Sequence, residues 1–414
     1  FISLIKIRYS WGQSGNAPSG TSPYIGTFEA VTPGYGDMNA VKPASPDLTH
    51  LKYETITSNN IGVDFGLFSD KVNFTFELYK KVTDDLLQKK MKVPSSTGLS
   101  TVAWYNSGKI QNKGWEFNID IAAVKTKDWS FNFGFNISQN KNEILELPEN
   151  KNDELYTFGN KNYAYSVMMG DPLGSFYGYR YKGVYQNVEE TYAVNTSGQR
   201  ILDIDGNPVV MKNGDQKVYP GDARYEDVNG DGVIDENDIV YLGNSNPTLT
   251  GGLNFTLRYK KVSLVAAFHG RAGQKVINQA RMDMENMRGK NNQSVAVLRR
   301  WRSEGDDTDI PRALYDKGYN YLGSDRFVED ASFLRLKTVT LKYQMPAKWM
   351  KAIGVNKLEL YATGYDMFVW TKYKGQDPEV NLKAANDGTV AQVAIDSNNT
   401  PKPFKIAFGL NLNF

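Results

Sequence analysis

The sequence of 414 residues contains no cysteine and only two histidines. Without cysteine there is no disulfide framework and no thiolate metal site, so size and hydrogen bonding must provide the stability. His50 and His269 have no local serine or aspartate arrangement that resembles a catalytic triad. A P-loop, a dinucleotide fingerprint and a zinc motif are also missing. We therefore expect that the protein is not an enzyme.

Long apolar runs are missing as well. No run of about 18 apolar residues occurs, which excludes a transmembrane helix but not a transmembrane β-barrel, whose strands alternate. The net charge is only +2, so nothing points to nucleic acid as a partner. Phe1 begins a strand pattern directly, without a Met or a signal peptide. We interpret Phe1 as an interior point of a longer gene product, whose targeting signals lie outside the sequence.

What the sequence does contain is period-two alternation of apolar and polar residues. Aromatic residues make up 13% of the chain, and Gly is abundant, a mixture that suits strands and tight turns. The last segment places Phe404, Ile406, Phe408, Leu410, Leu412 and Phe414 on one face. We expect strands near residues 3–13, 53–68, 71–83, 111–124, 129–140, 162–169, 175–185, 248–260, 262–272, 328–345, 357–371 and 404–414.

Alternation alone does not decide which face is wet, because a soluble β-sandwich alternates too. The connections between the expected strands decide the question. Long ones (14–52, 84–110, 141–161, 186–247, 273–327 and 372–403) alternate strictly with short ones (Ser69-Asp70, 125–128, 170–174, Lys260-Lys261 and 346–356). Short turns at one end and long loops at the other are typical of bacterial outer-membrane barrels. The sequence therefore predicts an all-β fold, an antiparallel transmembrane β-barrel with long extracellular loops and short periplasmic turns.

Two segments have helical character. Residues 273–303, within the loop 273–327, are rich in Ala, Met, Gln and Arg and are expected to be helical. Residues 346–350 are expected to form a single helical turn capped by Gly354. The loop 186–247 contains only scattered apolar residues, so we expect it to lack a hydrophobic core of its own and to need another anchor.

Residues 227–238 supply such an anchor, because their spacing fits the Ca²⁺ loop of an EF-hand. Oxygen ligands fall at the expected intervals, and Gly232 permits the sharp turn that the loop requires. The last ligand is an Asp rather than a Glu, which suggests a weaker site, and Mg²⁺ is an alternative if waters complete an octahedron. An acidic turn without a metal is the other interpretation. The predicted ligands are the side chains of Asp227, Asn229, Asp231, Asp235 and Asp238 and the carbonyl of Val233.

Aromatic residues allow two interpretations. Those within the expected strands, including Tyr163, Tyr177, Tyr185 and Trp370, are best explained as a girdle at the membrane interface. Four others fall in long loops, where contact with a ligand or partner and simple loop packing are equally consistent with the sequence. These four candidate ligand residues are Trp104, Tyr105, Tyr319 and Tyr321.

Several longer motifs resemble the SusC/RagA family of TonB-dependent outer-membrane transporters, in the order of that family and over essentially the whole chain. They include IRYSWGQSGN near the start, GSFYGYRYKGVYQN from Gly174, PGDARYEDVNGDGVIDENDIVYLGNSNPTLTGGLNFTLRYK from Pro220 and RFVEDASFLRLKTVTLKYQMP from Arg326. The final FGLNLNF, with Phe414, is similar to the last strand of outer-membrane barrels generally.

The resemblance implies a barrel of about 22 strands, of which this chain supplies about 12 from the C-terminal part. It also implies a plug and a TonB-contacting segment that lie outside the sequence, and a SusD-like surface lipoprotein that caps the barrel. Family cargo is usually an oligosaccharide and in some cases a peptide. The expected function is therefore TonB-dependent import across the outer membrane of a Gram-negative bacterium of the Bacteroidetes type.

Three other functions are considered. A passive porin or an outer-membrane adhesin would use the long loops for binding, and a plug and TonB segment upstream would exclude both. An outer-membrane hydrolase is disfavoured by the scarcity of histidine.

For the barrel itself, we expect Phe131, Phe133, Phe135, Leu253, Phe255 and Leu257 to contact lipid. We also expect the long loops to share the extracellular side and to provide the docking surface for the lipoprotein.

Overall fold

The computed structural model describes residues 1–414 except 21, 33, 35, 37, 100, 148–155, 158–162, 166–167, 353, 385–391 and 414, so Phe414 lies outside the described residues. The chain divides into two compact units. Unit 1 comprises Phe1–Ala123, Asn132–Asp153 and Val167–Pro172; unit 2 comprises Val124–Phe131, Glu154–Ser166 and Leu173–Phe414. Among the described residues, no helix is both long and apolar enough to cross a membrane.

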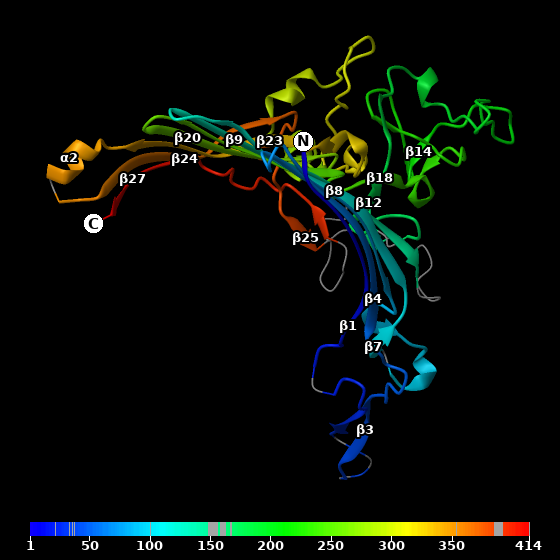
Figure 1. The fold of residues 1–414 in the computed structure, drawn as a ribbon. Coiled ribbons are helices and arrows are strands. Elements are labelled where there is room, and N and C mark those ends of the chain that lie inside the picture. The colour runs from blue at the N-terminus through cyan, green and yellow to red at the C-terminus, as the bar shows by residue number, and fades with distance from the viewer. Residues whose placement is uncertain are drawn as a thin grey trace. The chain divides into compact units, whose positions relative to one another are not determined.

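Ten long strands form one antiparallel sheet (Figure 1). Their order in the sheet follows their order in the chain, as expected for strands joined by successive hairpins. The strands are β1 Ile2–Asn16, β4 Glu54–Leu67, β5 Val72–Asp84, β8 Lys109–Lys125, β9 Trp129–Glu146, β19 Leu249–Tyr259, β20 Val262–Ala272, β23 Phe333–Gln344, β24 Lys357–Thr371 and β27 Lys405–Asn413. Several exceed the usual soluble strand of about 5–6 residues and reach the about 9–11 that a bilayer requires.

The short connections are tight, as predicted. Phe68, Ser69 and Asp70 turn the chain between β4 and β5 with positive φ angles of 55°, 58° and 60°. Tyr259 pairs directly with Val262, so Lys260 and Lys261 alone make the next turn. Between β23 and β24 lies helix α2 Ala347–Ala352, and Gly354 follows it at φ +69°, which confirms the predicted helical turn and its cap.

In each unit, the long connections leave the sheet at one end and the short ones at the other. In unit 1, residues 17–53 follow β1 and residues 85–108 follow β5; in unit 2, residues 273–332 follow β20 and residues 372–404 follow β24. Each of these pairs of strands runs in the same direction, because every strand is antiparallel to its neighbour. The predicted segregation of loop lengths is therefore confirmed within each unit.

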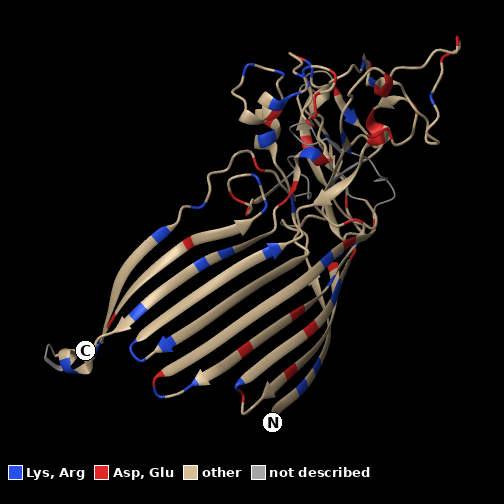
Figure 2. Cartoon of the chain, turned by 90° about the horizontal axis from the view of Figure 1, so that it is seen from above, with Lys and Arg blue, Asp and Glu red and all other residues tan. Residues whose placement is uncertain are grey.

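The two faces of the sheet differ in chemistry. Most strand positions are uncharged and are drawn in tan in Figure 2. On the polar face of unit 1, Arg8 donates to Asp64 at 2.9 Å and to Glu77 at 2.6 Å. On the other face, aromatic rings meet across strands, as in the stacked pair Phe65 and Phe74, whose centroids lie 4.8 Å apart. Such cross-strand pairs stabilise the register.

Many large apolar side chains of the sheet are exposed in the described part of the chain. The six residues predicted to contact lipid are all half-buried, and none belongs to a buried cluster. Phe408 on β27 is 82% exposed, and Ile7 on β1 is 75% exposed. An apolar surface of this extent is unfavourable in water, so its natural solvent is the lipid bilayer.

Two predicted barrel strands are wrong. Within the expected segments 162–169 and 175–185, the strands among the described residues are β11 Ala164–Tyr165, β12 Ser175–Gly178 and β13 Tyr181–Val184. β11 and β12 belong to a separate small sheet with β10 Tyr156–Thr157 and β18 Val240–Asn244, and β13 pairs with β16 Ala223–Tyr225. None of the described residues between β9 and β19 joins the large sheet, so the sheet has ten described strands rather than twelve. The apolar residues in these two segments therefore belong to strands of the small sheets and not to strands of the large sheet.

The remaining elements are short and lie in the connections. The expected strand 328–345 is interrupted, since β22 Val328–Asp330 pairs with β21 Lys275–Ile277 and only β23 joins the large sheet. The expected helix 273–303 is reduced to α1 Gln279–Glu285 and a 3-10 turn, Val295–Arg299. The other hairpins are formed by β2 Thr27–Val31 with β3 Ala40–Ser45, β6 Leu87–Lys92 with β7 Thr101–Asn106, β14 Lys212–Asn213 with β15 Gln216–Lys217, and β25 Leu382–Ala384 with β26 Gln392–Ala394; β17 Val233–Ile234 pairs with β14.

Candidate functional site

The long connections of unit 2 fold together into one body, which we call the loop body. It comprises the described residues of 156–165, 173–247, 273–332 and 372–403. One buried cluster joins all four segments, because it contains Tyr163, Phe176, Ile277, Met282, Met287, Val297, Ile310, Tyr321, Phe327 and Val393. At one end of the strands, unit 2 therefore carries a packed structure rather than independent loops.

The segment 186–247 has a core of its own, contrary to the prediction. Its scattered apolar residues converge in space, and the cluster consists of Tyr185, Ala193, Met211, Val218, Ala223, Tyr225 and Ile234. These residues are at most 5% exposed. The sequence concealed this core because its members come from turns and two- or three-residue strands, which have no readable period.

The strand aromatics assigned to a membrane girdle divide into two groups. Tyr163, Tyr177 and Tyr185 are at most 3% exposed inside the loop body, so the girdle interpretation is wrong for them. Burial raises the pKa of Tyr185 to about 12. By contrast, Trp370 on β24 is 52% exposed, as a girdle residue should be.

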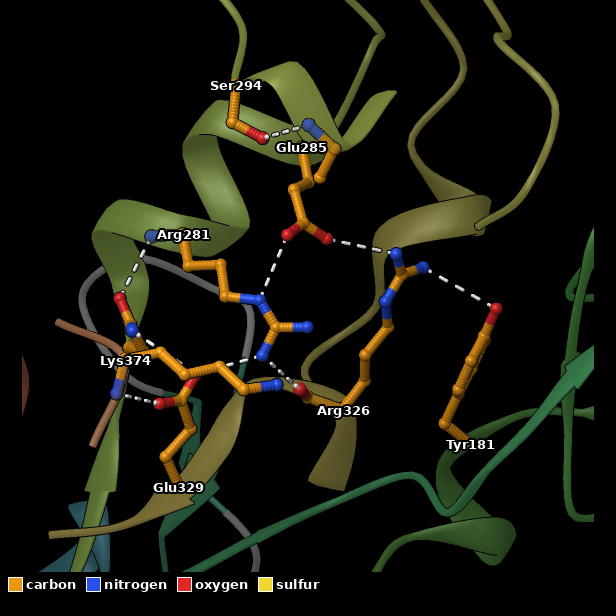
Figure 3. A network of polar contacts seen from close by, with 9 residues as sticks. Tyr181, Arg281, Glu285, Ser294, Arg326, Glu329 and Lys374 are labelled. Carbon is orange, nitrogen blue, oxygen red and sulfur yellow. Dashed lines mark hydrogen bonds and ion pairs between the residues drawn. The ribbon is translucent and has the colours of Figure 1, made fainter. Parts of the chain in front are cut away.

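A buried ion-pair network fixes α1 to the rest of the loop body (Figure 3). Arg281 donates to Glu285 at 2.9 Å and to Glu329 at 2.8 Å, and Arg326 donates to Glu285 at 3.0 Å. The side chains of Arg326, Glu285 and Glu329 are at most 9% exposed. Two cations and two anions balance, which offsets the desolvation that makes isolated buried charges costly.

The network also reaches the neighbouring segments. Glu329 accepts a hydrogen bond from the backbone N–H of Lys374 at 2.9 Å, and Arg326 donates to the Tyr181 hydroxyl at 3.5 Å. Burial raises the pKa of Tyr181, so this hydroxyl stays neutral. Sequence analysis missed this network. The i,i+4 spacing of Arg281 and Glu285 was the available signal, but the partners Arg326 and Glu329 are more than 40 positions away.

A second buried carboxylate joins the segment 186–247 to the segment 273–327. Asp222 is fully buried and accepts from Arg312 at 2.7 Å, from the Asn320 amide at 3.2 Å and from the backbone of Tyr219 at 2.8 Å. Next to it, Gly221 has a φ of +86° and leaves no room for a Cβ, which would lie 2.3 Å from the Trp301 ring. This close approach requires glycine.

The predicted cation loop is folded around its own acidic side chains. Asp227 accepts from the N–H groups of Gly230 and Gly232, both at 2.8 Å, and Asp231 accepts from Val233 at 2.8 Å. Gly232 has a φ of +85°, as the sharp turn requires. The predicted ligands Asn229 and Asp235 also accept backbone N–H bonds within the loop.

Asp238, the last predicted ligand, is fully buried and accepts from the N–H groups of Val228 at 2.7 Å and Asp235 at 2.9 Å. Burial raises the pKa of the Asp238 carboxyl, and the nearby Asp227 carboxylate adds to the effect. The oxygen donors suit a hard cation chemically. However, the described residues include no group of three or more His, Cys, Asp or Glu side chains placed to hold a metal ion. Calcium binding therefore stays a prediction.

The four loop aromatics are divided between the two units. Trp104 and Tyr105 lie on β7 in unit 1, where Lys89 Nζ sits 4.5 Å from the Trp104 ring and the Tyr105 hydroxyl donates to Gln88 at 2.8 Å. Tyr319 and Tyr321 lie in unit 2 on a 3-10 turn, Tyr319–Tyr321. Tyr319 is half-buried near Asp222, whereas Tyr321 is only 4% exposed in the main cluster.

Comparison with known proteins assigns the chain. A family model described as "TonB dependent receptor-like, beta-barrel" matches residues 2–210. The chain belongs to the TonB-dependent receptor family. This is a family of outer-membrane β-barrels that act as transporters and receptors rather than a class of enzymes, and the expected SusC/RagA membership is confirmed.

Relatives of this receptor segment match it over its whole length. It is 32% identical to TonB-dependent receptor P26 of Formosa agariphila, with 99% of the chain and 40% of the relative covered. It is 27% identical to TonB-dependent receptor SusC of Bacteroides thetaiotaomicron, with 100% of the chain and 38% of the relative covered. The RagAB peptide transporter has the same fold, with a TM-score of 0.74 at 22% identity, 100% of the chain and 41% of that chain covered. The segment thus spans about two fifths of the length of these proteins.

Proposed function

We propose that the protein to which this segment belongs imports oligosaccharides, or peptides, across the outer membrane in a TonB-dependent manner. The observation that carries the proposal is family membership combined with the antiparallel sheet, whose long connections build a packed loop body. Such a body gives a rigid surface at the mouth of a barrel, where ligand sites of barrel proteins lie.

The loop body also suits a macromolecular partner. A SusD-like surface lipoprotein requires a firm docking surface, and the two clusters with their ion-pair network supply that firmness. We therefore propose that the long connections face the cell exterior and contact the lipoprotein, while the short turns face the periplasm.

Calcium enters the proposal as a structural ion. We propose that Asp227, Asn229, Asp231, Asp235, Asp238 and the Val233 carbonyl hold one Ca²⁺, or Mg²⁺ with added waters. The support is the residue pattern and the buried Asp238 carboxylate, whose charge a cation would offset. The ion would stiffen the loop and take no part in transport chemistry.

The decisive experiment uses the full-length protein in cells. Uptake of a labelled cargo is measured in the parent, in a strain without TonB, and after collapse of the proton-motive force. Energy-coupled import predicts loss of accumulation in both treated samples. A passive porin would continue to equilibrate the cargo, and an adhesin would bind cargo without uptake in any sample, so either result would refute the proposal.

A further inference from the structure

A cavity of about 310 Å³ opens in the loop body beside the end of α1. Its volume is at the lower end of the range for small-molecule sites, about 300–1,000 Å³. All of its walls come from unit 2, and none of its residues belongs to the ion-pair network. The walls are formed chiefly by Met282, Asp283, Asn286, Arg288, Asn291 and Tyr321.

The cavity carries two charges of opposite sign. Asp283 and Arg288 are both exposed, and neither forms an ion pair with any described residue. Asp283 accepts one neutral hydrogen bond, from the Gln279 amide at 2.8 Å. The Arg288 guanidinium makes no hydrogen bond to the described part of the chain. By contrast, Arg281 and Arg326 in the same loop body do form ion pairs with buried glutamates. The charges in the cavity are thus left for a ligand.

The walls of the cavity are held in place by the core. Met287, which lies between Asn286 and Arg288 in the chain, has a φ of +44° and is buried in the main cluster. The carbonyl of Arg288 accepts from Asp316 at 2.9 Å, and Met284 accepts from Ser294 at 2.9 Å. These bonds fix the turn that presents Arg288, so the cavity does not have to form on binding.

The lining distinguishes between ligand classes. Sugar sites commonly use an aromatic ring as a stacking platform, but the aromatic residue here, Tyr321, is only 4% exposed and offers almost no free face. A neutral sugar would leave both charges without a counter-ion. An acidic sugar would pair with Arg288 and leave Asp283 unpaired. A ligand with one cationic and one anionic end pairs with both.

We propose that this cavity binds a short peptide with free ends. The ammonium group pairs with Asp283, the carboxylate pairs with Arg288 in the bidentate manner that a guanidinium favours, and the Asn286 and Asn291 amides bond to the peptide groups between them. The inference rests on the proposed import function and narrows its cargo to peptides.

Binding is measured by calorimetry on the purified full-length protein at low salt, with di-, tri- and tetra-alanine as probes. We expect at least one of them to bind. Asp283→Asn and Arg288→Gln should each weaken that peptide about five- to tenfold, the worth of one charged hydrogen bond. Controls are Glu304→Gln and Lys290→Gln, exposed charges of the same loop outside the cavity, which should leave affinity unchanged.

Peptides capped at one end, measured on the parent and on the variants, test which residue binds each end of the peptide. N-acetylation should weaken binding and remove the effect of Asp283→Asn, while C-amidation should do the same for Arg288→Gln. The proposal is overturned if no alanine peptide binds, if the variants bind like the parent, or if maltotriose binds and depends on Arg288. Because binding is measured without TonB or energy, these outcomes are separate from a failure of uptake.

Discussion

At the residue scale, Arg326 illustrates how the loop body obtains its rigidity. Its guanidinium donates to Glu285 and lies over the rings of Tyr181 at 5.0 Å and Phe327 at 5.1 Å. A planar cation of this kind satisfies a carboxylate and two aromatic faces at once, which a lysine could not do in the same geometry. The side chain therefore adds to the polar contacts, such as that of Arg312 with Asp222, that link the segments 173–247 and 273–332.

Replacing Arg326 by Met should destabilise the loop body by about 3–5 kcal/mol, because the buried Glu285 carboxylate loses a partner. Arg200→Met, which removes an exposed ion pair with Glu189, should cost less than about 1 kcal/mol. Hydrogen exchange of the loop body in the full-length protein measures both changes. Equal protection in the two variants would contradict a structural role for the network.

At the scale of elements, the long sheet strands could be predicted from sequence because each has one apolar and one polar face. The ends of β19, Leu249 and Tyr259, lie within one residue of the prediction. The small strands of the loop body could not be assigned, because β11 or β16 is too short to show a period. The ion-pair network and the cavity could not be predicted for a similar reason. Arg281, Glu329 and the cavity depend on contacts between distant segments, which residue spacing does not encode.

The apolar face of a sheet strand yields a second prediction. Phe255→Arg on β19 should cost about 2–4 kcal/mol on folding into lipid vesicles, because the charge must enter the hydrocarbon region. Asn254→Arg, the neighbouring and exposed residue on the other face, is the matched control and should cost much less. Urea titration of the refolded full-length protein gives both values. A larger cost for the control would mean that the faces are reversed.

The loop 227–238, the proposed cation site, yields a third prediction. Asp231→Ala should leave the large sheet folded but increase hydrogen exchange in residues 227–238, since the loop loses a proposed metal ligand and the hydrogen bond from the Val233 N–H. Asp215→Ala, an exposed Asp in the turn between β14 and β15, should have no such effect. Removal of Ca²⁺ by a chelator should reproduce the Asp231→Ala pattern in the parent. No response to the chelator would favour an acidic turn without a metal.

At the scale of the whole molecule, the arrangement of long and short connections can be tested by labelling. The chain has no cysteine, so single substitutions stand out against the parent. Ser197→Cys, at an exposed turn of the segment 186–247, should react on intact cells with a reagent that cannot cross the membrane. Lys127→Cys, in the turn between β8 and β9, should react only after the outer membrane is broken. The opposite labelling pattern would mean that the long connections face the periplasm and the short turns face the cell exterior.

The wide sequence separation within the loop body has a consequence for the order of events during biogenesis. Its core needs Val393, and the Tyr163 hydroxyl bonds to the carbonyl of Ser324, 161 positions later. The backbone of Ala394 similarly donates to Ser245, 149 positions earlier. Contacts of such high contact order form slowly and late. The segment 186–247, with a core of its own, can collapse early. The main cluster cannot form before β26 is available, and until then its apolar residues need protection by periplasmic chaperones.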